Sequence, residues 1–328
     1  MSYAGKRVLV TGAGGFIGSH LAERRVRDGA LVRALVRYDS AGSRGWLDRS
    51  ESAGSMEIVA GDVADRDSVR RAFEGVEIAF HLAALIGIPY SYAAPASYIR
   101  TNVEGTLNAL EAAREAGVAR LVHTSTSEVY GTARRVPIDE DHPLCAQSPY
   151  AASKIAADKL AEAYHRSFGV PVVTVRPFNT YGPRQSARAV VPAIAAQCLA
   201  GAPRIALGNL HPTRDLTYVD DTVDAFARAG LAAGVEGGTF HLGTGREISI
   251  GDLARLVARL TGCDAAIEAD PRRVRTERSE VERLVSDNAA ARRAFGWEPR
   301  VALEDGLART IEWLKGNAPA GFGAGYAI

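Results

Sequence analysis

Short apolar runs alternate with segments of helical periodicity through the first half of the chain. Runs of this kind, bounded by glycine or polar residues, predict buried strands of a parallel sheet, because helices cover both faces of such a sheet. The expected strands are residues 7–12, 31–37, 56–63, 78–84, 119–126 and 171–177. The expected helices are residues 19–30, 65–76, 101–117 and 149–168. This order predicts an α/β fold built on a doubly wound parallel sheet.

The alternation stops after Asn179, where two arginine-rich stretches interrupt it. Strand-helix patterns between these stretches indicate that the chain returns to the main sheet and then leaves it again. We therefore expect a dinucleotide-binding domain followed by a smaller, discontinuous C-terminal lobe that binds substrate. The expected division is 1–178 with 215–264 for the domain, 179–214 with 265–316 for the lobe, and 317–328 for a flexible tail.

Composition and charge argue against several kinds of partner and site. The 328 residues carry a formal net charge of +1, which favours neither nucleic acid nor an anionic membrane as partner. No apolar run reaches the ~20 residues that span a bilayer, and no leader peptide precedes the first strand. Three scattered cysteines indicate a reducing, cytoplasmic setting. His123, His142 and His211 lack metal-ligand spacing, so no metal site is expected.

A glycine-rich turn joins the first strand to the first helix. The sequence TGAGGFIG places Gly12, Gly15 and Gly18 there. Glycine permits a tight turn and the close approach of a pyrophosphate, whose charge then lies at the helix N-terminus. In this context the motif predicts a Rossmann-type site for a nicotinamide dinucleotide.

The end of the second strand distinguishes NAD from NADP. An acidic residue there binds the ribose 2′-hydroxyl, whereas an arginine accommodates a 2′-phosphate. Val36 stands where the acid is expected, Arg37 follows it, and Asp39 comes two residues later. Arg37 therefore favours NADP as the coenzyme. The alternative is that Arg37 stacks on adenine or points to solvent, and in that case it does not distinguish the two coenzymes.

Motifs along nearly the whole chain resemble the extended short-chain dehydrogenase/reductases that act on nucleotide sugars. They are TGxxGxxG at 11–18, HLAA at 81–84, TNVEGT at 101–106, TSTSEVYG at 124–131, SPYAASK at 148–154, RPFNTYGPRQ at 176–185, RDLTYVDD at 214–221 and FHLGTG at 240–245. The Val-Arg end of the second strand and Thr-Ser-Glu resemble GDP-mannose 4,6-dehydratases. HLAALIGIPYSYAAP, with YVDDTVD, is similar to the 4,6-dehydratases of legionaminic-acid-type pathways.

The resemblance implies a coenzyme recycled in each turnover, a nucleotide-sugar substrate, and a homodimer through helices 101–117 and 149–168. The implied coenzyme contacts are Gly12, Gly15, Phe16, Ile17, Gly18, Arg37, Asp62, Val63, Leu82, Ala83, Ala84, Asn102, Tyr150, Lys154 and Pro177. The implied substrate contacts are Ser127, Asn179, Arg188, Arg214 and Arg278. Guanidinium groups suit bidentate phosphate contacts. RTERSEV lacks the proline of the family's RPxEV element, which leaves the loop around Arg278 undefined.

Tyr150 and Lys154 are the expected proton-transfer pair. Ser148 and Pro149 suit the N-cap and first position of a helix, so the pair lies one turn apart on one face. The lysine ammonium would lower the pKa of the phenol. The tyrosinate can then take a proton from a sugar hydroxyl while hydride leaves the same carbon for nicotinamide. Thr126 is expected to hydrogen-bond that hydroxyl.

Glu128 indicates which reaction follows the hydride transfer. A 4-epimerase needs no carboxylate, and related epimerases usually carry a small hydroxyl residue at this position. A ketone at C4 acidifies the proton on C5, which Glu128 can remove while the C6 hydroxyl leaves as water. Ser127 stands where dTDP-glucose dehydratases usually have an aspartic acid, so Glu128 itself or water would protonate the departing hydroxyl. The alternative for Glu128 is an ion pair with an arginine such as Arg184.

The sequence therefore favours a 4,6-dehydratase that makes a 4-keto-6-deoxy sugar. A 4-epimerase or a UDP-glucuronate decarboxylase on the same scaffold remains open, since the latter enzymes also carry Thr-Ser-Glu. A non-catalytic, coenzyme-sensing protein is a third alternative, although such relatives tend to lose the Tyr or Lys retained here.

Overall fold

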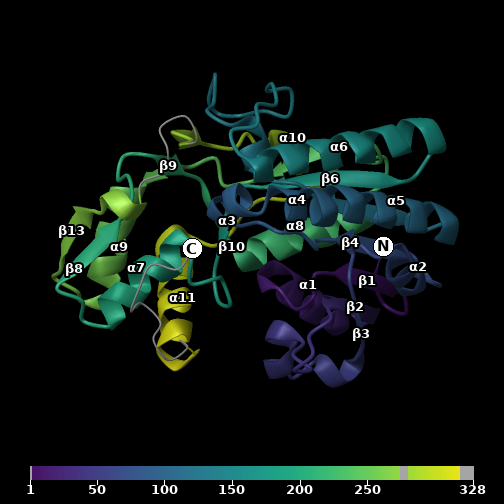
Figure 1. The fold of residues 1–328 in the computed structure, drawn as a ribbon, viewed down its shortest axis with the longest axis horizontal. Helices are drawn as coiled ribbons and strands as arrows, with labels where there is room; N and C mark the ends of the chain where they lie inside the picture. The colour runs from purple at the N-terminus through teal and green to yellow at the C-terminus, as the bar shows by residue number, and fades with distance from the viewer. Residues whose placement is uncertain (1, 274–279, 318–328) are drawn as a thin grey trace.

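The fold is built on a seven-stranded, entirely parallel sheet, seen in the computed structural model of residues 2–273 and 280–317 (Figure 1). The strand order is β11-β6-β5-β4-β1-β2-β3. The strands are β1 (Arg7–Thr11), β2 (Leu31–Arg37), β3 (Met56–Gly61), β4 (Ile78–His81), β5 (Arg120–Thr124), β6 (Val172–Pro177) and β11 (Thr239–Leu242). The order reverses between β1 and β4, the place where ligands bind in open α/β sheets. The expected Rossmann-type sheet is thus confirmed.

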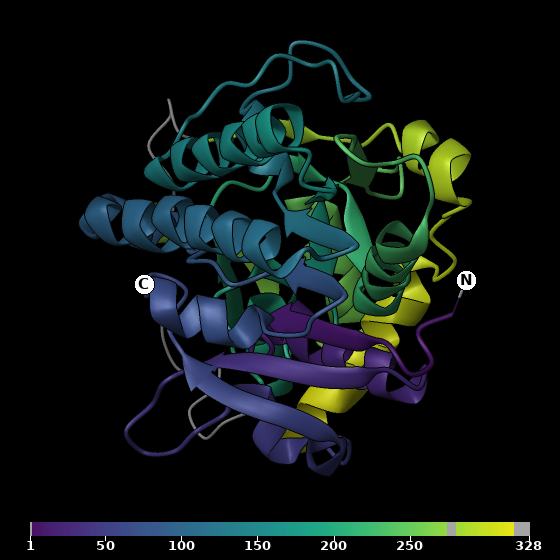
Figure 2. The ribbon, with the colours of Figure 1, turned by 90° about the vertical axis from the view of Figure 1, so that its right-hand side faces the viewer.

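Helices cover both faces of the sheet. The first layer is formed by α2 (Arg66–Phe73), α5 (Gly105–Ala116) and α6 (Pro149–Phe168), which lie side by side in Figure 2. The opposite layer contains α1 (Phe16–Arg27) and α8 (Val219–Leu231), which pack on each other and on the strands. The connection after β4 carries the short helices α3 (Ile88–Ala93) and α4 (Pro95–Tyr98).

Local sequence sets several helix boundaries. Asp65 caps α2 by accepting a hydrogen bond from the Ser68 amide, and Ser148 caps α6 by accepting one from the Ala151 amide. The expected helix 101–117 differs at its start, because residues Ile99–Glu104 form a π-helical turn before α5 begins.

The smaller lobe lies to the left of the sheet in Figure 1. Its main elements are α7 (Val190–Leu199), β8 (Arg204–Leu207), α9 (Ile250–Thr261), β13 (Ala266–Ala269) and α11 (Leu303–Asn317). Short strands join it to the domain: β7 (Asn179–Tyr181), β9 (Thr213–Arg214), β10 (Leu216–Tyr218), β12 (Ile248–Ser249) and β14 (Arg283–Leu284). Strand β7 pairs with β10, and β9 pairs with both β12 and β14.

The segment 215–264 does not return to the main sheet as a whole. Helix α8 and strand β11 do return, but α9 packs its buried face on α7 in the lobe. The physical reason is that β12, which leads into α9, pairs with β9 rather than with the main sheet. Conversely, α10 (Ala289–Phe295) contacts β11 of the main sheet although it was expected in the lobe.

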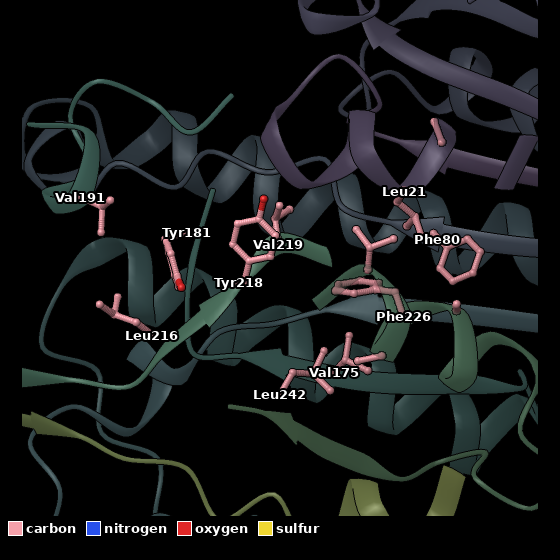
Figure 3. Close-up of a cluster of buried hydrophobic side chains, with 14 of the residues drawn as sticks. Leu21, Phe80, Val175, Tyr181, Val191, Leu216, Tyr218, Val219, Phe226 and Leu242 are labelled. Carbon is pink, nitrogen blue, oxygen red and sulfur yellow. The ribbon is translucent and has the colours of Figure 1, made fainter. Parts of the chain in front are cut away.

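One apolar core connects domain and lobe. Figure 3 shows Leu21, Phe80 and Phe226 at one end of this cluster and Tyr181 with Leu216 towards the other. All of these side chains are buried. The lobe is therefore held against the domain by continuous packing rather than by a linker alone.

Within residues 2–273 and 280–317, no helix is both long and apolar enough to cross a membrane, and no cluster of side chains is suited to a metal ion. Cys145, Cys198 and Cys263 are free thiols.

Candidate active site

The glycine-rich turn has the close packing that its sequence predicts. Gly12 has a φ of +68°, and a Cβ there would meet the Ala83 amide nitrogen at 2.9 Å. A Cβ on Gly18 would meet the Gly12 carbonyl oxygen at 2.2 Å. Gly15 is the N-cap of α1, with Phe16 and Ile17 as its first two residues. Only glycine fits at positions 12 and 18. The turn leads into the N-terminus of α1, as a pyrophosphate site requires.

A loop after β2 packs against this turn, and sequence reasoning missed it. The Trp46 amide donates to the Gly14 carbonyl over 2.9 Å, and a Cβ on Gly14 would meet the Arg44 carbonyl oxygen at 2.6 Å. The Trp46 ring contacts Trp313 of α11 edge to face, with centroids 5.4 Å apart. Gly45, with a φ of +65°, was the available signal, since the turn needs a glycine there.

The expected adenosine contacts surround the ends of β2 and β3. Arg37 and Asp62 are exposed, and Val63 is buried. The Asp62 carboxylate accepts a hydrogen bond from the Ala64 amide over 2.9 Å, which fixes the turn after β3. Arg37 is open to solvent, so its guanidinium is accessible to a ligand.

The end of β4 is tied to β1. Thr11 Oγ1 accepts hydrogen bonds from the Leu82 and Ala83 amides, each over 3.1 Å. Ala84 follows and is half-buried. These contacts hold the small residues at the switch point of the sheet, where a bulky side chain would obstruct a dinucleotide.

Asn102 and Pro177, two of the expected coenzyme contacts, are both buried, and Pro177 ends β6. The Asn102 side chain accepts from the Leu85 amide over 2.8 Å, and donates to the Leu85 carbonyl and to Ser153 Oγ. Because these bonds use the amide at both ends, Asn102 positions the loop after β4 against α6.

Tyr150 and Lys154 lie one turn apart on α6, and both are buried. Lys154 Nζ donates to the Thr124 carbonyl over 2.6 Å. Burial lowers the pKa of Lys154 to about 8 and raises the pKa of Tyr150. The sequence argument expected Lys154 to lower the phenol's pKa, but desolvation is the largest effect and acts in the opposite direction.

The turn after β5 brings its side chains to Tyr150. This turn is the 3₁₀ helix η4 (Ser127–Tyr130), whose N-cap is Thr126. Thr126 hydrogen-bonds Tyr150 and so lowers the pKa of the phenol, while the negative charge of Glu128 raises it. Ser127 is buried beside them. The Thr126 hydroxyl therefore lies at the phenol, and the Glu128 carboxylate is near enough to act on the phenol electrostatically.

The alternative ion pair for Glu128 is not formed. The Arg184 guanidinium lies 2.9 Å from Glu23 of α1 and also donates to Ser19 Oγ over 3.2 Å. Within residues 2–273 and 280–317, Glu128 has no ion-pair partner within 4.0 Å, so its carboxylate is available for proton transfer.

Tyr98, which sequence reasoning also missed, forms a wall beside the phenol. Its ring meets the Tyr150 ring edge to face, with centroids 6.2 Å apart. Its hydroxyl donates to the Gly87 carbonyl over 2.5 Å. Ile88 completes the buried cluster. The aromatic-rich sequence IPYSYAAPASY was the available signal.

The expected substrate ligands have different surroundings. Asn179 lies on β7, and its Oδ1 is buried without a hydrogen-bond partner among the described residues. Arg188 is exposed, yet its charge acts on Tyr98. Arg214 is buried and donates to the Thr213 and Val281 carbonyls over 2.8 Å each. Arg278 lies outside the described residues.

The residues present fit a nicotinamide dinucleotide. The glycine cradle excludes any Cβ at Gly12 and Gly18, and Thr124 Oγ1 at the end of β5 is buried with no partner in the described part of the chain. Backbone amides at a helix N-terminus are the donors that a pyrophosphate needs.

Comparison with known proteins agrees with this geometry. The model of the GDP-mannose 4,6 dehydratase family matches residues 9–310. A UDP-glucose 4-epimerase of Mycolicibacterium smegmatis is 39% identical over 317 residues, covering 95% of this chain and 99% of that protein. A dTDP-glucose 4,6-dehydratase of Streptomyces niveus is 34% identical, covering 95% of this chain and 93% of that protein.

A solved structure has the same fold. DesIV, a dTDP-glucose 4,6-dehydratase from Streptomyces venezuelae with NAD and TYD bound, matches with a TM-score of 0.85 and 34% identity, over 95% of this chain and 97% of that chain. Both the family match and these similarities extend over nearly the whole chain. The protein therefore belongs to the GDP-mannose 4,6 dehydratase family, within the extended short-chain dehydrogenase/reductases that act on nucleotide sugars.

Proposed function

We propose that this protein is a nucleotide-sugar 4,6-dehydratase. It converts a nucleoside-diphosphate hexose, linked to GDP or UDP and with or without an N-acetyl group, into the 4-keto-6-deoxy sugar. The observation that carries the proposal is the Glu128 carboxylate, which acts electrostatically on Tyr150 and has no ion-pair partner among the described residues.

The chain's own groups would divide the chemistry between them. Tyr150 takes the proton of the C4 hydroxyl, and Thr126 orients that hydroxyl beside the phenol. A nicotinamide coenzyme held at the glycine-rich turn would accept the hydride from C4 and return it to C6. Glu128 would remove the C5 proton that the C4 ketone has acidified, and Glu128 itself or a water would protonate the C6 hydroxyl, which leaves as water. A proton from solvent would be added at C5, and Tyr150 would release the C4 proton to solvent, which restores the starting enzyme.

A 4-epimerase is the second candidate, and the 39% identity to a UDP-glucose 4-epimerase favours it. A UDP-glucuronate decarboxylase shares the first step. Incubation with GDP- and UDP-hexoses and with UDP-glucuronate, followed by mass spectrometry, separates the three. Loss of water supports the proposal, whereas unchanged mass with a new stereoisomer or loss of carbon dioxide replaces it.

The choice of coenzyme depends on Arg37. Its exposed guanidinium at the end of β2 is suited to a 2′-phosphate, whereas the related dehydratase DesIV was solved with NAD. We expect Arg37→Ala to weaken NADP binding at least about tenfold, the loss of one charge-assisted contact, and to leave NAD binding nearly unchanged. Titration calorimetry with both coenzymes measures this. Two results would exclude Arg37 as a ligand of the 2′-phosphate. One is a wild type that binds NAD more tightly than NADP, and the other is an Arg37→Ala variant that loses equal affinity for both coenzymes.

We also propose a homodimer through α5 and α6. Ile99 and Leu107 are 47% and 37% exposed, and together with the half-buried Val103 they form an apolar stripe. The small residues Ala152 and Ala163 are exposed on neighbouring α6, which permits close helix packing between copies.

Leu107→Glu is expected to convert this dimer to a monomer, because it places a charge in the apolar stripe. Size-exclusion chromatography with light scattering measures the mass. Leu199→Glu is the matched control, since Leu199 is also 37% exposed but ends α7 in the lobe. A Leu107→Glu protein that stays dimeric would exclude this interface.

A further inference from the structure

Helix α6 carries a third buried polar residue, Asp158, in line with the catalytic pair. Tyr150, Lys154 and Asp158 are spaced four residues apart and therefore share one face of the helix. Their exposed fractions are only 7%, 4% and 5%. A buried carboxylate at this position needs hydrogen-bond or ion-pair partners, because burying an unpaired charge costs free energy of folding.

Four hydrogen bonds hold the Asp158 carboxylate. Oδ1 lies 3.1 Å from His123 Nε2, and Oδ2 accepts from Ser125 Oγ over 2.7 Å. Oδ2 also accepts from Arg176 Nε and Nη2 over 3.1 and 2.8 Å. These bonds favour the ionised form and lower the pKa of Asp158 to about 2 despite its burial. The group is an anion at any physiological pH.

The same stretch of β5 holds Lys154. The Thr124 carbonyl accepts from Lys154 Nζ, while His123 and Ser125, on either side of Thr124, contact Asp158. Three consecutive residues, the last two of β5 and Ser125 directly after it, thus bind two residues one helical turn apart on α6. This interlock fixes the helix that carries Tyr150 to the end of β5.

Asp158 is the anion that opposes the desolvation of Lys154. The titratable or charged side chains around this pair are Tyr150 on α6, Tyr98 on α4, His81 on β4, His123 on β5, Glu128 on η4 and Arg176 on β6. Burial lowers the pKa of both histidines, so they are neutral near pH 7. Arg176 pairs directly with Asp158 and also donates to Tyr130.

We propose that Asp158 is a positioning residue: it fixes α6, with Tyr150 and Lys154, to the end of β5, and its negative charge keeps Lys154 charged. The proposal rests only on the hydride-transfer step of the proposed function, which dehydration, epimerisation and decarboxylation share. The hydrogen bonds of Asp158 are to His123, Ser125 and Arg176, so it acts on the catalytic pair by placing α6 and by its charge.

Asp158→Asn tests the charge while keeping the shape. Asp158 raises the pKa of both Lys154 and Tyr150, so removing its charge lowers both. The pH profile of coenzyme reduction, measured by absorbance with a nucleotide hexose, should move to lower pH by about one unit. Glu162→Gln makes the same charge change on the outer side of α6, where Glu162 pairs with Lys159 and Arg166, and should leave the profile in place. A uniform loss of activity without displacement of the Asp158→Asn profile would overturn the proposal.

A second measurement needs no substrate. Urea unfolding at pH 7 of the wild type, Asp158→Asn, Lys154→Met and the double variant forms a double-mutant cycle. We expect Asp158→Asn to lower the unfolding midpoint more when Lys154 is present than when Met replaces it. Equal effects in both backgrounds would refute the coupling. If none of the nucleotide sugars tested reduces the coenzyme of the wild type, the proposed function fails. The double-mutant cycle still decides the role of Asp158 in that case.

Discussion

Phenylalanine in place of Tyr150 is expected to reduce turnover by roughly 10²–10⁴-fold, the usual contribution of a positioned acid-base group. The substitution removes only the hydroxyl that Thr126 binds, while the ring still fills its place against Tyr98. Coenzyme affinity should therefore be unchanged. The rate is measured as product formed per enzyme, and the affinity by titration of the coenzyme's fluorescence.

Tyr98→Phe provides the matched control for this experiment. It removes a phenol hydroxyl from the neighbouring ring, one that donates to the Gly87 carbonyl rather than to a substrate. A loss much smaller than that of Tyr150→Phe is expected. Activity that persists in Tyr150→Phe would exclude Tyr150 as the base for the C4 hydroxyl.

Helix α6, which carries Tyr150 and Lys154, was the part of the site that the sequence predicted best. Ser148 and Pro149 are local signals for a helix start, and four-residue spacing then places Tyr150 and Lys154 on one face. The strands were predictable for a similar reason, since each is a short apolar run such as Leu31–Arg37.

The electrostatics of the pair were not predictable from spacing. A lysine one turn from a tyrosine predicts a lowered pKa for the phenol, but burial opposes this and is the larger effect. Burial is decided by tertiary packing, here by Tyr98 from the connection after β4. The same limit applies to Asp158, whose partners come from β5 and β6, so that no local pattern identified it.

The path of residues 250–261 differs from the expected return to the main sheet for a topological reason. Strands β9 and β12 are two residues each, too short for a periodicity to distinguish them from loop. Their pairing carries α9 into the lobe, and only the three-dimensional structure shows the neighbours of such short segments.

Glutamine in place of Glu128 is expected to separate hydride transfer from loss of water. The amide keeps the shape of the side chain but cannot accept the C5 proton, so dehydration should fall by roughly 10²–10⁴-fold. Removing the charge of Glu128 also lowers the pKa of Tyr150, because that charge raises it in the wild type. Oxidation at C4 should therefore persist. Reduced nicotinamide absorbance reports the oxidation, and deuterium uptake at C5 from heavy water reports the proton removal.

Glu115→Gln is the control, since Glu115 is an exposed carboxylate near the C-terminal end of α5 that pairs with Arg66 of α2. It should leave both signals unchanged. The proposal requires that Glu128→Gln lose deuterium uptake and water elimination together while the reduced coenzyme still forms. Unimpaired dehydration in this variant would show that another group removes the C5 proton. An unchanged rate of C4 inversion, with no dehydrated product even in the wild type, would instead identify an epimerase, because inversion at C4 requires no carboxylate at position 128.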